Sequence, residues 1–179
     1  MNYRRLNRLG GYDYAQEGYY FVTVCVKERV EWFGNIEDGK MILNEYGKIV
    51  KQQWGWLVQH YPYLASDEYV IMPNHVHGIV VIERNGHDRS LRKIKSLSEL
   101  IGAFKTTSSK IIHQAGCSDF QWQKSFYDHI IRNEQSLTQI REYIRHNPLK
   151  WAEDIENNTM VVGNGRDHSL QFINQQEEN

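Results

Sequence analysis

The sequence predicts a single α+β domain in which helices pack on one antiparallel sheet. Strand-like runs and segments of helical periodicity alternate in the order β-α-β-β-α-β, and one more helical segment follows. Two of the strand-like runs are separated only by Pro73 and Asn74, which indicates a hairpin and therefore antiparallel neighbours. The chain has 179 residues, of which 40% are hydrophobic and 24% charged, so it can bury a core of its own.

The first half of the chain supplies a strand, a small hairpin and a helix. The run YYFVTVCVK, residues 19–27, is β-branched and aromatic and predicts a strand. Asp38-Gly39 lies between two short apolar pieces and predicts a small hairpin. Apolar residues then recur at helical spacing over residues 43–60, and a proline closes this helix.

The second half supplies a hairpin, a helix and a fourth strand. DEYVIM and HVHGIVVIE predict the two strands on either side of Pro73-Asn74. After a polar loop, Ser96 and Glu99 form a capping box for a helix that Gly116 ends. The run QWQKSFYDHIIR, residues 121–132, predicts the fourth strand.

One further helix, LTQIREYIRHN, follows the fourth strand, and we expect Ser136 to cap it and Pro148 to stop it. A β-α-β-β-α-β order favours the ferredoxin-like (RRM-like) sandwich, which has a four-stranded antiparallel sheet. Two helices would cover one face, and the other face is left for a ligand or the last helix. We assign residues 1–154 to this domain and residues 155–179 to a polar C-terminal tail.

Composition restricts the class of protein. Cys25 and Cys117 lie far apart without metal-type spacing, which favours reduced thiols and a cytoplasmic location. The N-terminus has no apolar stretch, and no run approaches the roughly 20 apolar residues of a membrane span. The formal net charge is −1, so a nucleic-acid partner has to be held by local basic patches.

His75 and His77 stand one residue apart at the start of a strand. Residues i and i+2 share a face of a strand, with Cα atoms about 6.6–6.8 Å apart, so both rings can converge on one ion. Val76 would point into the core, and Gly78 would leave room beside the rings for a substrate oxygen. The alternative is a pair of exposed or hydrogen-bonded histidines near a turn.

The last helix offers a partner for this pair. Its expected buried stripe consists of Leu137, Ile140 and Ile144. Tyr143 and Asn147 lie one turn apart on one shoulder of that stripe, with Cβ atoms about 6 Å apart. The alternative is that Tyr143 is a boundary aromatic and that Asn147 is only the last helical residue before proline.

Two imidazoles, a phenol and a cation suit chemistry on a phosphodiester. A phenol has a pKa of about 10, so it becomes a useful nucleophile when a cation lowers that pKa or polarises the electrophile. Attack on phosphorus would give a phosphotyrosyl ester that keeps the bond energy. Strands could then be rejoined without a nucleotide triphosphate.

The runs DEYVIMPNHVHGIVV, FKTTSS, WQKSFYDHIIRNE and YIRHNPLKW resemble the single-tyrosine HUH transposases, an IS200-like group, and most of all the REP-associated tyrosine transposases. The resemblance covers about residues 7–151. It implies a ferredoxin-like fold, Mg²⁺ or Mn²⁺, and cleavage of single-stranded, palindromic (hairpin) DNA through a 5′-phosphotyrosine intermediate with a free 3′-OH.

Carried over position by position, the resemblance makes His75, His77 and Asn147 metal ligands and Tyr143 the nucleophile. Insertion-sequence members usually have Gln where this chain has Asn147, whereas REP-associated members have Asn, which favours the hairpin-processing branch. The family also holds its DNA with basic residues. We assign that role to Arg4, Arg5, Arg8, Arg92, Lys93, Lys95 and Lys105.

The sequence leaves several alternatives open. Tyr127 and His129 share a strand face and are rivals for the nucleophile and a ligand. A non-catalytic nucleic-acid-binding module with vestigial histidines would use the same sheet. A zinc hydrolase built on H-x-H is disfavoured because no Asp-His follows the pair. We expect a monomer, with a homodimer as the alternative.

Overall fold

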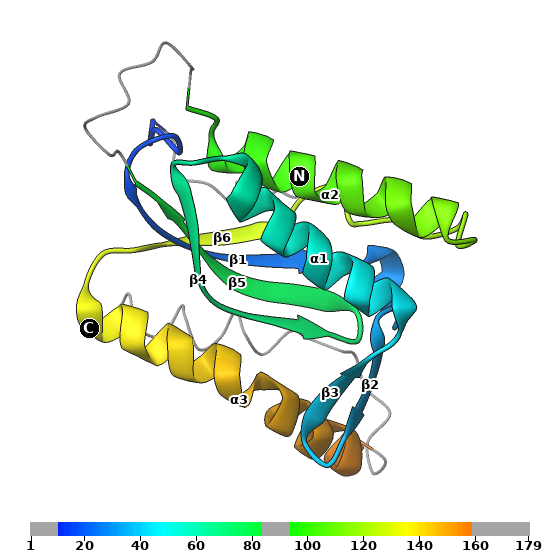
Figure 1. Ribbon diagram of the computed structural model, residues 1–179. Helices are drawn as coiled ribbons and strands as arrows, with labels where there is room; N and C mark the ends of the chain where they lie inside the picture. The colour runs from blue at the N-terminus through cyan, green and yellow to red at the C-terminus, as the bar shows by residue number, and fades with distance from the viewer. Residues whose placement is uncertain (1–10, 84–93, 159–179) are drawn as a thin grey trace, which may run out of the picture.

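A computed structural model of the chain describes residues 11–83 and 94–158, with side chains up to Trp151. These residues form one four-stranded sheet, a small two-stranded sheet and three α-helices (Figure 1). The elements follow in the order β1 (Gly18–Cys25), a 3-10 turn η1 (Lys27–Arg29), β2 (Gly34–Glu37), β3 (Lys40–Leu43), α1 (Glu45–His60), β4 (Leu64–Met72), β5 (His75–Ile82), α2 (Leu97–Gln114), β6 (Tyr127–Ile131) and α3 (Glu134–Asn158).

The main sheet has the strand order β4-β5-β1-β6, and all of its pairings are antiparallel. With the small β2–β3 hairpin set aside, this is the ferredoxin-like arrangement, so the predicted fold class is confirmed. β1 and β5 are the two central strands. Their register places Thr23 opposite His77 and Cys25 opposite His75.

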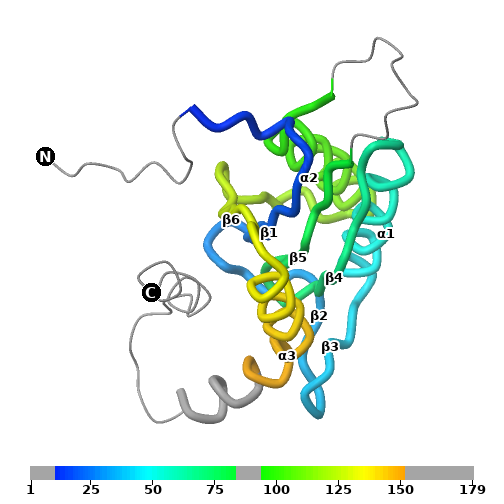
Figure 2. Tube along the Cα trace, turned by 90° about the vertical axis from the view of Figure 1, so that its left-hand side faces the viewer, coloured from blue at the N-terminus to red at the C-terminus, as the bar shows by residue number. Residues whose placement is uncertain are grey.

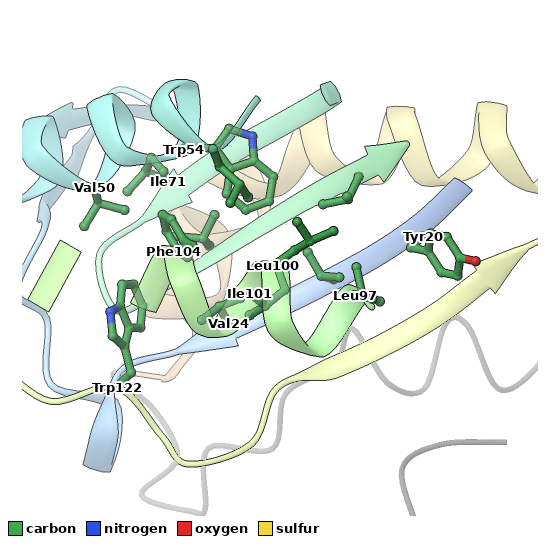
Figure 3. Packing of buried hydrophobic residues seen from close by; sticks show 14 of the residues in the cluster. Tyr20, Val24, Val50, Trp54, Ile71, Leu97, Leu100, Ile101, Phe104 and Trp122 are labelled. Atoms are coloured by element: carbon green, nitrogen blue, oxygen red, sulfur yellow. The ribbon is translucent and has the colours of Figure 1, made fainter. Parts of the chain in front are cut away.

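One face of the sheet carries the larger core. Side chains from alternate positions of β1 and β5 point toward α1 and α2, because successive residues of a strand face opposite ways. Tyr20 and Val24 of β1 belong to the same core as Trp54 of α1 and Phe104 of α2 (Figure 3). These side chains are almost fully buried, so this face provides most of the hydrophobic stabilisation.

The other face is covered by α3, which lies across the sheet on the side opposite α1 and α2 (Figure 2). Phe21 and Ile79 of the central strands pack there against the helix stripe of Leu137, Ile140 and Ile144. All eight residues of β5 are therefore buried, although the strand contains two histidines.

Helix ends follow local sequence signals. Ser96 and Glu99 form the expected capping box at the start of α2. Gly116, at φ +100°, follows the last turn of α2, and the amides of Gly116 and Cys117 donate to the carbonyls of His113 and Ile112. The predicted cap at Ser136 is wrong, because Asn133 accepts from the Ser136 amide at 2.8 Å and α3 begins at Glu134.

The predicted stop at Pro148 is also wrong, since α3 continues through it to Asn158. The β2–β3 hairpin packs on this second half of the helix: a Cβ atom at Gly39 would lie 2.9 Å from Cδ1 of Leu149. Tertiary contact thus outweighs the helix-breaking tendency of proline. The boundary between domain and tail after residue 154 stays a prediction.

Two further expectations need correction. The fourth strand, β6, spans only Tyr127–Ile131, and in the preceding segment Trp122 turns into the core, where its Nε1–H donates to Ser108. Gly78 does not make room beside the histidines, because it lies on the opposite face of β5, beneath Trp54. Among residues 11–83 and 94–158, no helix is long and apolar enough to cross a bilayer.

We expect Gly78→Ala to lower the free energy of unfolding by about 1–3 kcal/mol, the usual cost of overpacking a core. The added Cβ would lie 2.4 Å from Cζ2 of Trp54, and the Trp54 indole is held by a 2.9 Å hydrogen bond to Ser66. Urea unfolding measures the change. Gly55→Ala is the matched control, because no atom lies within 4 Å of its Cβ position and alanine favours the helix. Equal stability of the two variants would contradict the packing argument.

Candidate active site

The two histidines lie at the start of β5 on the face that α3 covers. His75 is 4% exposed and His77 is fully buried, while Val76 between them packs into the core on the other face. Nε2 of His75 lies 2.9 Å from Nε2 of His77. The two rings therefore converge, at a distance that also fits the alternative of a hydrogen-bonded pair.

The pair has the spacing that a shared cation requires. Two nitrogens that bind one cation at about 2.1 Å and at right angles lie about 3 Å apart. Among the described residues, no group of three or more His, Cys, Asp and Glu side chains could hold a metal ion. A site built on His75 and His77 therefore has to take its remaining ligands from amide or hydroxyl oxygens, or from a substrate.

Helix α3 brings further side chains onto the pair. The Tyr143 hydroxyl lies 3.4 Å from Nε2 of His77, and the two ring centroids are 5.3 Å apart. Two turns later, the Trp151 ring lies 5.7 Å from the His75 ring. Asn147 is midway between them on the same side of the helix and is 8% exposed. The position of Asn147 on the helix thus lies between a phenol and an indole that each contact one of the histidines.

Ion pairs fix the position of α3 over the sheet. Arg141 donates to both carboxylate oxygens of Asp67 on β4, with the shortest contact at 2.6 Å. One turn later, Arg145 donates to Glu68 at 2.9 Å through Nε. The Arg141 guanidinium holds the pKa of the Asp67 carboxyl below its ordinary value. These contacts flank Tyr143, so they set where its hydroxyl lies.

Two side chains of β1 and one from the turn before β5 contact the imidazoles directly. Oδ1 of Asn74 lies 2.7 Å from Nδ1 of His75, and Oγ1 of Thr23 lies 2.8 Å from Nδ1 of His77. The Phe21 ring stacks on His77 with centroids 5.5 Å apart. Burial, followed by the charges of His77 and Arg29, lowers the pKa of His75 well below its ordinary value. His75 is therefore a neutral imidazole, the form that binds metals.

Sequence reasoning missed Thr23, Phe21 and Trp151. The first two could not be found without the β1–β5 register, which is a tertiary property. Trp151 had a local signal, since it follows Asn147 by one helical turn, but the predicted stop at Pro148 concealed it.

Lys150, from the same turn of α3 as Trp151, places its ammonium 5.7 Å from the centroid of the Tyr143 ring.

The other candidate residues are placed as follows. Tyr127 lies on the same face of the sheet as the site, with its ring 6.4 Å from that of Phe21, and His129 follows two positions along β6. Lys105 donates to the carbonyls of Gln123 and Ser125, and the Lys95 ammonium lies over the Tyr61 ring. The remaining predicted DNA contacts, Arg4, Arg5, Arg8, Arg92 and Lys93, lie outside the described residues.

Comparisons with known proteins agree on one family. Residues 15–147 match the family model described as "Transposase IS200 like". An uncharacterized protein of Haemophilus influenzae is 38% identical over 167 residues, which cover 86% of this chain and 93% of that protein. A second H. influenzae protein, whose name places it among the REP-associated tyrosine transposases, is 26% identical over 160 residues and covers 83% and 76% of the two chains.

A solved structure of a REP-associated tyrosine transposase bound to a REP hairpin has a similar fold. The TM-score is 0.56 at 21% sequence identity, and the match covers 84% of this chain and 73% of that chain. At this level of identity the likeness supports the fold, and the sequence matches carry the family assignment.

We expect Asp67→Asn to lower the free energy of unfolding by about 1 kcal/mol at pH 6, because it removes a two-point ion pair with Arg141. The pKa of Asp67 is lowered in the folded chain, so this contribution is present above the pKa of the unfolded chain. It is lost as the pH falls through the lower folded value. The difference between wild type and variant should therefore shrink from pH 6 to pH 3.

Urea unfolding at pH 6, 4 and 3 measures this difference. Asp119→Asn, in the exposed turn after α2, serves as the control and should leave stability unchanged at each pH. A difference that stays constant down to pH 3 would contradict the assigned role of the Asp67 carboxylate.

Proposed function

Because this chain belongs to the IS200-like transposase family, we propose that it cleaves and rejoins single-stranded DNA through a phosphotyrosine bond at Tyr143. The observation that carries the proposal is the position of the Tyr143 hydroxyl, 3.4 Å from Nε2 of His77 and beside two converging imidazoles. The family match covers both the histidines and the tyrosine. If Tyr143 served only to fill space between the helix and the sheet, its hydroxyl would not need to lie beside Nε2 of His77.

In the proposed reaction the Tyr143 oxygen attacks phosphorus and the bond from phosphorus to the 3′ oxygen breaks. The 5′ phosphate stays on the tyrosine, and the leaving oxygen takes a proton and becomes a free 3′-OH. The phenol proton would pass to water, because a His77 Nε2 atom that binds a cation has no lone pair left to accept it. The reverse attack by a 3′-OH restores a phosphodiester and frees Tyr143, so joining needs no nucleotide triphosphate.

His75, His77 and Asn147 would hold Mg²⁺ or Mn²⁺. The positive charge of the cation would stabilise the negative charge on the non-bridging phosphate oxygens. The fit rests on the 2.9 Å spacing of the two Nε2 atoms and on the buried position of Asn147, one helical turn from both Tyr143 and Trp151. Two imidazoles and an amide oxygen are neutral, so the cation would keep its full charge for the phosphate. Lys150 adds a positive charge near the phenol ring, with its ammonium 5.7 Å from the ring centroid.

The proposed substrate is a palindromic strand that folds into a hairpin. The support is the relative named as a REP-associated tyrosine transposase, together with the likeness to a transposase bound to a REP hairpin. The seven basic residues assigned above remain predicted DNA contacts. Of these, Lys105 already holds the backbone before β6, so its replacement would also disturb that segment.

A single chain can supply the whole proposed site. α3 packs on the sheet of its own chain, and Tyr143 therefore reaches the histidines of the same chain. We accordingly propose that a monomer is active, with exchange of α3 between two chains as the alternative.

We expect Tyr143→Phe to abolish covalent attachment to DNA, with a loss of at least about a thousandfold. The variant keeps the aromatic ring that contacts Phe21 and His77, so the fold and DNA binding should persist. The measurement is an SDS-resistant adduct between the protein and a labelled single-stranded hairpin in the presence of Mn²⁺. Tyr127→Phe is the matched control and should retain the adduct.

Two outcomes would contradict the proposal. If wild type forms no adduct with hairpin substrates while it binds them, the chain is a non-catalytic nucleic-acid-binding module. If Tyr127→Phe loses the adduct and Tyr143→Phe retains it, the nucleophile has been misassigned.

We expect Asn147→Ala to weaken Mn²⁺ binding by at least about tenfold, since it removes the third proposed ligand. Asn147→Gln keeps an amide oxygen and should lose less. Titration followed by electron paramagnetic resonance of free Mn²⁺ measures the affinity without DNA. Gln135→Ala, at an exposed position in the first turn of α3, is the control. An unchanged affinity in Asn147→Ala would remove this residue from the ligand set.

A further inference from the structure

We propose that Asn74 and Thr23 are positioning residues that set the tautomers of the two histidines. Asn74 holds His75 with its proton on Nδ1, whereas Thr23 allows His77 to take either tautomer. The tautomers are properties of the ion-free protein. Only their consequence for cation binding rests on the proposed function.

The orientation of Asn74 is fixed from the β1–β2 connection. Its Nδ2 donates to the backbone carbonyl of Arg29 at 2.9 Å. A carbonyl can only accept, so the amide nitrogen must face Arg29 and Oδ1 must face His75. Oδ1 can likewise only accept, and it lies 2.7 Å from Nδ1 of His75, so that nitrogen carries the proton. In the neutral ring Nε2 is then left with its lone pair.

The backbone that presents the Arg29 carbonyl is strained. Glu28 and Arg29 have φ values of 59° and 58°, in the left-handed region that costs a residue with a side chain about 1 kcal/mol or more. The surrounding structure holds this turn in place. The Val26 amide donates to the carbonyl of Asn74 at 2.9 Å, and the Phe33 amide donates to that of Pro73 at 3.0 Å. The strained turn and the turn before β5 thus form one hydrogen-bonded unit.

Thr23 differs from Asn74 because a hydroxyl can both donate and accept. It lies opposite His77 in the β1–β5 register, is 2% exposed, and places Oγ1 2.8 Å from Nδ1 of His77. The buried position leaves little room for water to replace this partner. If Nδ1 of His77 carries the proton, the Thr23 hydroxyl accepts it. If Nε2 carries the proton, the hydroxyl rotates and donates to Nδ1.

The short distance between the histidines determines which tautomer His77 takes. Its Nε2 lies 2.9 Å from Nε2 of His75, and two lone pairs at that distance repel. Since His75 presents a lone pair, His77 carries its proton on Nε2 and donates it to His75, while its Nδ1 accepts from Thr23. For both Nε2 atoms to offer lone pairs to a cation, the His77 proton has to move to Nδ1, with Thr23 as its acceptor.

The test is long-range ¹H–¹⁵N correlation spectroscopy of the ¹⁵N-labelled protein, without divalent ions and then with Mg²⁺. In the ion-free protein we expect His75 protonated on Nδ1 and His77 on Nε2. With Mg²⁺ the His77 proton should be found on Nδ1, and His75 should not change. Asn74→Ala should leave His75 as a mixture of tautomers.

Thr23→Val and Thr23→Ser form a matched pair, because valine keeps the shape of threonine and serine keeps the hydroxyl. We expect Thr23→Val to bind Mn²⁺ about 10–100-fold more weakly than wild type and Thr23→Ser to stay near wild type. Circular dichroism and thermal unfolding confirm that each variant is folded.

Each outcome bears on the inference separately from the proposed reaction. Protonation of His75 on Nε2 in the ion-free protein overturns the role of Asn74. A His77 proton that does not move with Mg²⁺, or a Thr23→Val variant with wild-type Mn²⁺ affinity, overturns the role of Thr23. If the tautomers behave as expected but no DNA adduct forms, the positioning roles hold and the strand-transfer proposal fails.

Discussion

The site depends on the packing of α3 across the second face of the sheet. A four-stranded sheet with helices on one side leaves an apolar face exposed, and here Phe21, Ile79 and Val81 form that face. The stripe on α3 covers it, and the two arginine–carboxylate pairs set where along the sheet the helix lies. Hydrophobic burial makes the packing of α3 on the sheet favourable, whereas the ion pairs fix the position of the helix along the sheet. The phenol is brought to the imidazoles by the same contacts that complete the core.

The same packing explains why polar groups are tolerated in a buried strand. His75 and His77 occupy positions that would otherwise be apolar, and burying an imidazole without partners is costly. Asn74 and Thr23 supply those partners from the turn and from the neighbouring strand. The chain therefore keeps two imidazoles in its interior, with their Nε2 atoms 2.9 Å apart.

Much of this arrangement could be predicted from the sequence because its signals are local. The order of strands and helices, the capping box at Ser96 and the shared face of His75 and His77 all follow from periodicity over a few residues. The pairing of Tyr143 with Asn147 follows from helical spacing. Contacts that depend on strand register, such as Thr23 with His77, could not be predicted, because a single sequence does not fix the register in which two strands pair.

The errors have two causes. Local rules for helix ends predict a stop at Pro148 and a cap at Ser136, but the hairpin packed at Leu149 and the cap at Asn133 outweigh those rules. Gly78 was assigned to the histidine side because it follows them in sequence, whereas the alternation of a strand places it under Trp54. Local rules gave the elements reliably and their ends less so.

Pro148 within α3 has a mechanical consequence. Proline has no amide hydrogen, so the carbonyl of Ile144 loses its partner four residues on, and the helix is easiest to bend at that level. The segment before this point is tied to β4 through Arg141 and Arg145, while the segment after it rests on the β2–β3 hairpin. A displacement of the hairpin would therefore tilt the Trp151 indole against His75 first, and the phenol would keep its place.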